Sequence, residues 1–286
     1  MRSKKYPWLK QRLPSDSAHQ NVESLMNRLR LNTVCREAQC PNLRECFSKK
    51  TATFMIMGSR CTRNCGFCAV FHGPAGPPDP DEPDRVAEAV QHLRLNYAVI
   101  TSVTRDDLPD GGASLFARTV KAIRRKTPDA RVEVLIPDFQ GSKTALKIVV
   151  DSRPDVLNHN LETVPRLYDT ARPGAVYRRS LDLLKQVKMY APAMITKSGI
   201  MLGLGESSEE IHQTLLDLFK TGCRLLTLGQ YLQPSGAHLP VARYVPPEEF
   251  DRLREAALEM GFTEVASGPF VRSSYRAQKL FNAVTI

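Results

Sequence analysis

The middle of the chain alternates short apolar or β-branched runs with longer segments in which apolar residues recur at helical spacing. The short runs predict strands at 53–58, 97–103, 131–136, 155–158, 195–203 and 224–231. The segments between them predict helices at 83–95, 113–126, 142–151, 177–189 and 208–221. Strands that alternate with helices pair in parallel through right-handed crossovers, so the pattern predicts an α/β fold, a partial six-stranded (β/α) barrel.

Segments on both sides of this alternation lie outside the predicted barrel. A helix at 248–260, a strand-like run at 262–267 and a final helix after Ser274 follow the sixth strand. We therefore expect an N-terminal extension over 1–50, the barrel over 51–232 and a C-terminal extension over 233–286.

Composition agrees with a globular protein and narrows its surroundings. The 286 residues, 42% of them apolar, are enough for one barrel-sized domain with a substantial core. No apolar run approaches the roughly 18–20 residues of a membrane span, and the N-terminus lacks the apolar core of a secretory signal. Seven cysteines, an odd number, fit a reducing compartment where thiols stay free for metal. These features predict a soluble, cytoplasmic protein.

The net charge of +10 favours an acidic partner, either a nucleic acid or an acidic protein domain. The basic residues are spread along the chain, with one local run at 124–126. No motif of a nucleic-acid-binding module accompanies them, so we expect no nucleic-acid partner. The alternative is a basic surface that is merely solvated.

Six of the seven cysteines form two triplets, Cys35, Cys40 and Cys46, then Cys61, Cys65 and Cys68. A structural zinc site takes four protein ligands, so each triplet is one ligand short. A cubane iron-sulfur cluster held by three thiolates leaves its fourth iron open to a substrate, a cofactor or a weaker ligand. Two triplets therefore predict two 4Fe-4S clusters, with a zinc knuckle or a redox dithiol as the alternatives.

The second triplet, C-x3-C-x2-C with Phe67 before its last cysteine, follows the first predicted strand. It resembles the motif of the radical S-adenosylmethionine (SAM) enzymes. The resemblance implies that SAM binds the open iron of the cluster at Cys61, Cys65 and Cys68. Reductive cleavage of SAM then yields a 5'-deoxyadenosyl radical that abstracts hydrogen from an unactivated carbon. It also implies a radical SAM barrel, with reactive groups at the carboxyl ends of the strands.

The first triplet, C-x4-C-x5-C, resembles the auxiliary-cluster motif of one family, lipoyl synthase. The resemblance covers most of the chain. It continues in the segments 6–10 (Y-P-W-L-K), 101–107 (T-S-V-T-R-D-D), 158–163 (N-H-N-L-E-T), 197–199 with 205–206, and 271–276 (V-R-S-S-Y-R). It implies a transferase that inserts sulfur at C6 and C8 of an octanoyl chain on a lipoyl carrier domain, in lipoate biosynthesis. The Cys35, Cys40 and Cys46 cluster is then the sulfur donor.

Several polar groups follow predicted strands, and each has an ordinary alternative. Asn158, Asn160 and Glu162 could bind the ribose or amino group of SAM, or form an Asx turn. Gly205 and Glu206 could let the backbone approach a ligand, or form a tight strand-to-helix turn. We also expect cofactor contacts from three further residues, Phe67, Arg178 and Lys197. The two cations could meet the SAM carboxylate, although most such cations are solvated.

Ser274 precedes a helix-like segment, and its local sequence is typical of an N-cap. The resemblance implies another role, because the second serine of R-S-S-Y ligates the remaining iron of the auxiliary cluster in lipoyl synthases. A hard oxygen is displaced from iron more easily than a thiolate, which suits a cluster that is consumed.

Three other interpretations stay open at this point. A methylthiotransferase and a biotin-synthase-like enzyme are the radical SAM alternatives, and a zinc-bearing nucleic-acid-binding module is the alternative outside enzymes. For the favoured function we expect octanoylated lipoyl carrier domains, a reductant protein and an iron-sulfur cluster assembly or carrier protein as partners.

Overall fold

The computed structural model describes residues 6–9, 18–49 and 51–284 of the chain. The described residues form two compact units. One, here called the N-terminal unit, contains 18–49, 51–64 and 68–157. The other, the C-terminal unit, contains 6–9, 65–67 and 158–284. Lys10 of the 6–10 motif lies outside the described residues.

The N-terminal unit contains a mainly parallel sheet. Its strands are β1 (Asn32–Thr33), β2 (Thr53–Ile56), β3 (Tyr97–Ser102), β4 (Arg131–Leu135) and β5 (Val156–Asn158), the last of which ends on a residue of the other unit. Strands β2, β3 and β4 pair in parallel, whereas β1 pairs with β2 in antiparallel fashion. All four residues of β2 are buried, which is typical of a parallel strand covered on both faces.

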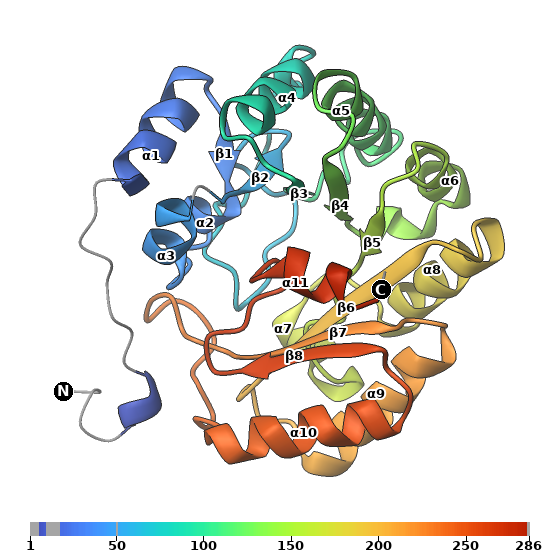
Figure 1. Ribbon diagram of the computed structural model, residues 1–286. Coiled ribbons are helices and arrows are strands. Elements are labelled where there is room, and N and C mark those ends of the chain that lie inside the picture. The colour runs from blue at the N-terminus through green and yellow to red at the C-terminus, as the bar shows by residue number, and fades with distance from the viewer. Residues whose placement is uncertain (1–5, 10–17, 50, 285–286) are drawn as a thin grey trace. The chain divides into compact units, whose positions relative to one another are not determined.

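Helices precede or connect these strands (Figure 1). They are α1 (Ala18–Arg28), α2 (Val34–Glu37), α3 (Leu43–Ser48), α4 (Glu82–His92), α5 (Ala113–Lys126), α6 (Lys143–Asp151) and the short 3-10 helix η3 (Phe139–Gly141). Helix α5 packs against both α4 and α6. Its apolar residues recur at helical spacing, so that Leu115, Phe116 and Ile123 are buried. The sequence pattern thus decides which face of the helix meets the sheet.

The C-terminal unit contains a second set of parallel strands, β6 (Ile195–Leu202), β7 (Leu225–Gln230) and β8 (Glu264–Gly268). Its helices are η2 (Pro7–Leu9), η4 (Pro165–Leu167), α7 (Tyr168–Ala171), α8 (Tyr177–Tyr190), α9 (Ser208–Lys220), α10 (Pro247–Glu259) and α11 (Ala277–Asn282). Ser207 and Glu210 form a capping box that begins α9. Helix α10 connects β7 to β8 and packs against β8 (Figure 1).

The α/β fold class is confirmed, and each predicted strand and helix is found within a few residues of its predicted bounds. The structure also adds the predicted strand at 262–267 to the parallel sheet as β8, beside β7. Strand β1 and helices α2 and α3 were not predicted, because β1 has two residues and α2 and α3 have at most six. The longer helix α1 was not predicted either. The division into 1–50, 51–232 and 233–286 stays a prediction.

None of the helices in the described part of the chain is both long and apolar enough to cross a bilayer.

Ile100 offers a test of the core of the N-terminal unit, because it lies in β3 and is completely buried. We expect Ile100→Ala to lower the free energy of unfolding by about 2–5 kcal/mol through lost burial and the cavity left behind. Met189→Ala is the control, since this side chain is 70% exposed and should change stability by less than about 0.5 kcal/mol. Urea unfolding measures the free energy of unfolding of both variants. Equal losses of stability in the two would contradict the burial of Ile100.

Candidate active site

Two short helices of the N-terminal unit, α2 and α3, contain Cys35 and Cys46, and Cys40 lies in the segment between them. Thr33 accepts a hydrogen bond from the Arg36 amide and caps α2, so that Cys35 stands in the first turn. The Cys40 amide donates to the Cys35 carbonyl at 3.0 Å, and α3 carries Cys46. None of the three forms a disulfide bond. The chain therefore gathers them into one short segment.

Burial controls the protonation of this triplet. It raises the pKa of Cys35 to about 12 and that of Cys46 to about 11, and Cys40 adds to both shifts. Because charge repulsion falls with distance, this coupling places Cys40 near both partners. Metal binding would have to displace the thiol protons.

The donor set fits an iron-sulfur cluster better than a single ion. Among the described residues, no three His, Cys, Asp or Glu side chains converge on a position for one metal ion. A cubane is wider than a single ion and takes thiolates that stand farther apart. Three cysteines that form no disulfide suit such a cluster.

Cys61 begins the loop after β2, and main-chain bonds close this loop at its base. The Cys61 amide donates to the Phe71 carbonyl at 2.8 Å, and the Gly73 amide donates to the Cys61 carbonyl at 2.9 Å. The Thr104 amide, beyond β3, donates to the Cys61 sulfur at 3.3 Å. Such N–H donors stabilise a thiolate ligand. Cys61 thus lies where the sequence predicts it, after the first strand of the parallel sheet.

Arg63, between Cys61 and Cys65 in sequence, fixes this loop to residues that follow two other strands. Its Nε donates to Asp106 at 2.6 Å, and its Nη2 donates to Asp138, also at 2.6 Å. Burial disfavours the guanidinium charge, but the two carboxylates outweigh burial and raise the pKa of Arg63. The loop therefore has a rigid anchor beside its cysteines.

Residues 65–67 belong to the C-terminal unit, where Gly66 is held by main-chain bonds. Its amide donates to the Ala171 carbonyl at 3.0 Å, and its carbonyl accepts from the Leu239 amide at 2.8 Å. A Cβ on Gly66 would lie 2.9 Å from the Leu239 Cγ, so this approach favours glycine. Phe67 is half-buried next to it.

Arg172 brings a positive charge close to Cys65. Its Nη1 donates to the Asn160 carbonyl at 3.0 Å and to the Tyr168 hydroxyl at 3.1 Å. Burial disfavours the charge, but Tyr168, Glu162 and Cys65 outweigh burial and raise the pKa of Arg172. The sequence gives no signal for this residue, because an isolated arginine in a loop is usually solvated.

Three of the predicted cofactor residues lie together at the end of β5 and just beyond it. Asn158 Nδ2 donates to the Ser273 hydroxyl at 2.8 Å, and that hydroxyl donates to Asn160 Oδ1 at 2.9 Å. Asn160 Nδ2 donates to Glu162 Oε1 at 3.0 Å. Asn160 therefore uses both ends of its amide on other side chains, which differs from the Asx turn considered as its alternative.

Glu162 is held in a strained, left-handed conformation with φ of 66°. Its amide donates to the Gly199 carbonyl at 2.9 Å and its carbonyl accepts from the Met201 amide at 2.8 Å, so the residue is fixed against β6. Burial raises the pKa of Glu162, and the nearby Arg172 and Asn160 oppose this shift. The carboxyl group therefore lies in a partly desolvated position, as groups at functional sites often do.

Lys197 lies on β6 with its side chain completely buried. It shares a face of the strand with Gly199, because side chains two residues apart point the same way. A Cβ on Gly199 would lie 3.0 Å from Asn160 Oδ1, so this face of β6 adjoins the asparagines. A buried lysine needs an anionic or polar partner, which agrees with its predicted place in the site.

The other predicted contacts have ordinary structural surroundings. Glu206 accepts hydrogen bonds from the Gly203 amide at 2.5 Å and the Leu204 amide at 2.9 Å. Gly205 has φ of 109° in the same tight turn, which is the alternative considered from the sequence. Arg178 is exposed near the start of α8. The cofactor roles of these residues stay predictions.

Ser274 does not cap a helix. Helix α11 begins at Ala277, and its N-cap is Arg276, which has a left-handed φ of 50°. The Ala277 amide donates to the Ser274 carbonyl at 3.3 Å. The N-cap interpretation is therefore wrong, because the helix starts later than the sequence indicates, while the role of Ser274 as an iron ligand stays a prediction.

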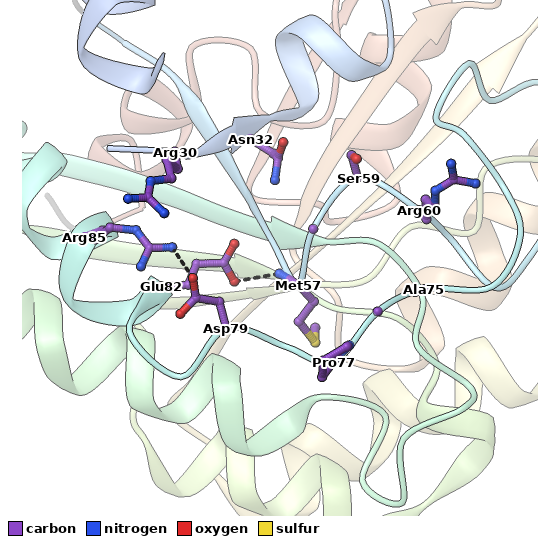
Figure 2. A pocket seen from close by; sticks show the side chains of 12 residues that line it. Arg30, Asn32, Met57, Ser59, Arg60, Ala75, Pro77, Asp79, Glu82 and Arg85 are labelled. Atoms are coloured by element: carbon purple, nitrogen blue, oxygen red, sulfur yellow. Dashed lines mark hydrogen bonds and ion pairs between the residues drawn. The ribbon is translucent and has the colours of Figure 1, made fainter. Parts of the chain in front are cut away.

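A cavity of about 330 Å³ lies in the N-terminal unit next to the residues that lead into Cys61 (Figure 2). Its lining includes three arginines and two carboxylates, namely Arg30, Arg60, Arg85, Asp79 and Glu82. Arg85 pairs with Asp79 at 2.8 Å, and Glu82 accepts from a main-chain amide at 2.7 Å. Because the carboxylates are engaged, the lining has an excess of positive charge that favours an anionic group.

Several known proteins are similar to this chain in sequence. The family model of the radical SAM superfamily matches residues 55–218. A lipoyl synthase of Desulfotalea psychrophila is 60% identical over 281 residues, which cover 98% of this chain and 94% of that protein. Lipoyl synthases of Histophilus somni and Rubrobacter xylanophilus are 58% and 55% identical, over 86% and 85% of their lengths.

Two solved structures share the fold at low sequence identity. HydG, a maturase of the [FeFe]-hydrogenase, has a TM-score of 0.57 at 14% identity, over 94% of this chain and 68% of HydG. Streptococcus suis SuiB bound to S-adenosylmethionine has a TM-score of 0.56 at 14% identity, over 76% of this chain. The match spans about half of SuiB, 51% of its length. These likenesses concern the fold.

Similarity over nearly the full length confirms the enzyme class and its cofactors, SAM and 4Fe-4S clusters, that the cysteine triplets predict. These relatives do not support the methylthiotransferase, biotin-synthase-like and zinc-module alternatives, since all three are named lipoyl synthases. The chain belongs to the lipoyl synthase family of the radical SAM superfamily.

Proposed function

We propose that the chain inserts two sulfur atoms, at C6 and C8, into an octanoyl chain on a lipoyl carrier domain, with one cysteine triplet for each half of the chemistry. The observation that carries this proposal is the pair of cysteine triplets, none of them in a disulfide and each one ligand short of a closed site, in a chain of this family. When bound, a 4Fe-4S cluster with SAM supplies the hydrogen-abstracting radical, and a second cluster supplies sulfide.

The radical half is assigned to Cys61, Cys65 and Cys68. The Thr104 amide at 3.3 Å from the Cys61 sulfur stabilises a thiolate there. The positive charge of Arg172 does the same for Cys65. Arg63 keeps the loop in place through its two carboxylates.

SAM is assigned to the strand ends of the C-terminal unit. Asn158, Asn160 and Glu162 offer amide and carboxyl groups of the kind that bind a ribose or an amino group. The buried Lys197 would meet the SAM carboxylate. Weaker contacts are proposed for four further residues, Phe67, Arg178, Gly205 and Glu206.

The sulfur-donor half is assigned to Cys35, Cys40 and Cys46, with Ser274 as the fourth ligand. Cys35 is buried and Cys46 half-buried, which limits the access of solvent to bound thiolates. An oxygen ligand is released from iron more easily than sulfur, which suits a group that is used up. We assign the sulfur-donor residues to the extension 1–50, the radical residues to the barrel 51–232 and Ser274 to the extension 233–286.

Three kinds of partner follow from this function: octanoylated lipoyl carrier domains, a reductant protein and an iron-sulfur cluster assembly or carrier protein. The cytoplasm, where thiols stay reduced, would suit seven cysteines that form no disulfide. No role for nucleic acid is proposed. Of the basic run at 124–126, Arg124 and Arg125 are paired with Asp155 and Asp84, which reduces its net charge.

Product analysis tests the function directly. Anaerobic protein should contain about eight irons for two cubanes. Incubation with an octanoylated lipoyl-domain peptide, SAM and reductant should yield a peptide whose mass shows two added sulfur atoms. Protein that contains zinc in place of iron, or iron-loaded protein that leaves the octanoyl peptide unchanged, would contradict the proposal.

Carrier binding should depend on salt. The enzyme has a net charge of +10, so an acidic carrier domain should bind roughly tenfold more weakly at about 0.5 M than at about 0.05 M salt. Equilibrium binding of the octanoylated carrier to the enzyme measures this change. An affinity that is unaffected by ionic strength would show that charge does not recruit the carrier.

A further inference from the structure

The side chain of Ser273 joins two segments of the C-terminal unit that are far apart in sequence. Its hydroxyl accepts from Asn158 Nδ2 at 2.8 Å and donates to Asn160 Oδ1 at 2.9 Å, across 115 and 113 residues. A serine hydroxyl has one proton, so it can serve both amides in only one arrangement. The chain of bonds continues from Asn160 to Glu162 Oε1 at 3.0 Å and ends on that carboxyl group.

These bonds are made in a buried setting. Asn158 is completely buried and Asn160 is 7% exposed. A buried amide that loses its hydrogen-bond partner pays the cost of desolvation, so the missing hydroxyl would disturb both asparagines.

Strands β6 and β7 each have a glycine where the 271–276 segment or Asn160 approaches them. A Cβ on Gly229 of β7 would lie 2.2 Å from the Val271 carbonyl oxygen. A Cβ on Gly199 of β6 would lie 3.0 Å from Asn160 Oδ1. Two neighbouring strands therefore omit a side chain where the 271–276 segment and Asn160 approach. The 271–276 segment is therefore held in place by main-chain packing as well as by the Ser273 hydroxyl.

We propose that Ser273 is a positioning residue, which rests on the proposed function: it fixes the backbone that presents Ser274 to iron and orients Asn158 and Asn160 toward SAM. Ser273 contacts neither group itself. Its one hydroxyl links the residues assigned to the two cofactor sites, so that the asparagines and Ser274 are placed together.

Four variants test this assignment: Ser273→Ala removes the hydroxyl, Ser273→Thr keeps it, Ser274→Ala removes the proposed ligand, and Ser235→Ala changes an exposed serine elsewhere in the unit. Mössbauer spectra of ⁵⁷Fe-loaded enzyme report iron ligation, and equilibrium binding reports the SAM Kd. We expect Ser273→Ala to reproduce most of the spectral change caused by Ser274→Ala and to weaken SAM binding about fivefold, as expected for one lost hydrogen bond.

Ser273→Thr and Ser235→Ala should resemble the unaltered enzyme in both measurements. If Ser274→Ala changes the spectrum but Ser273→Ala does not, the positioning role is wrong while the proposed function stands. If Ser274→Ala leaves the spectrum unchanged, the ligand assignment in the proposed function fails. If Ser273→Ala takes up less iron, Ser273→Thr decides: recovery of the iron content and spectrum supports the role of the hydroxyl, and failure of both variants overturns it.

Discussion

Cys35→Ala should leave SAM cleavage intact and abolish the sulfur-containing product, whereas Cys65→Ala should abolish both. Cys35 is 5% exposed, and burial raises the pKa of its thiol to about 12, so it serves no acid–base or nucleophilic role without metal. Its removal leaves the first triplet with two thiolates, too few for a stable cluster. Cys65 belongs to the other triplet, next to Arg172.

Chromatography of 5'-deoxyadenosine and methionine measures SAM cleavage, and mass analysis of the octanoylated peptide measures sulfur insertion. Each loss should exceed about a hundredfold, since a missing cluster removes a reactant rather than a supporting contact. Loss of cleavage in the Cys35 variant with its retention in the Cys65 variant would reverse the assignment of the two triplets.

Cys223→Ala is the matched control for both variants. Cys223 is completely buried, and its sulfur lies 3.5 Å from the Leu225 carbonyl oxygen in the turn between α9 and β7. It is remote from both triplets in sequence and packs as a small apolar residue. We expect its variant to keep cleavage and sulfur insertion, with a modest loss of stability. A Cys223 variant without product would mean that loss of any thiol impairs the enzyme.

Periodicity predicts most of the fold because the core strands and the long helices are strongly patterned. Strand β7 is buried at every residue, and α5 buries one regular face. Strand β1 escaped prediction because two residues carry no period. Cysteine spacing predicts the triplets because thiolate ligands are few and chemically distinctive.

The remaining site residues depend on tertiary contacts that a sequence does not display. Arg172 donates hydrogen bonds to the Asn160 carbonyl and the Tyr168 hydroxyl, and neither partner can be inferred from the local sequence pattern. Ser273 lies in the recognised R-S-S-Y motif, yet its partners are 113 and 115 residues away. At Ser274 the local sequence is misleading instead: it is typical of a helix N-cap, but the helix begins only at Ala277.

Gly229→Ala should lower sulfur insertion at least about tenfold and SAM cleavage less, by no more than the roughly fivefold effect expected for loss of the Ser273 hydrogen bonds. The added Cβ would stand 2.2 Å from the Val271 carbonyl oxygen, well inside van der Waals contact. That oxygen belongs to the main chain, so the 271–276 segment must shift to make room. Overpacking of this kind costs roughly 1–3 kcal/mol, which displaces the segment without unfolding the chain.

Gly236→Ala is the matched control, because no atom lies within 4 Å of the position its Cβ would take. Product analysis and thermal unfolding of both variants separate a local displacement from a general loss of stability. If the Gly229 variant forms product at the normal level, the position of the 271–276 segment does not affect sulfur transfer. Loss of product with cleavage retained would indicate that the placement of Ser274 limits the second half of the reaction.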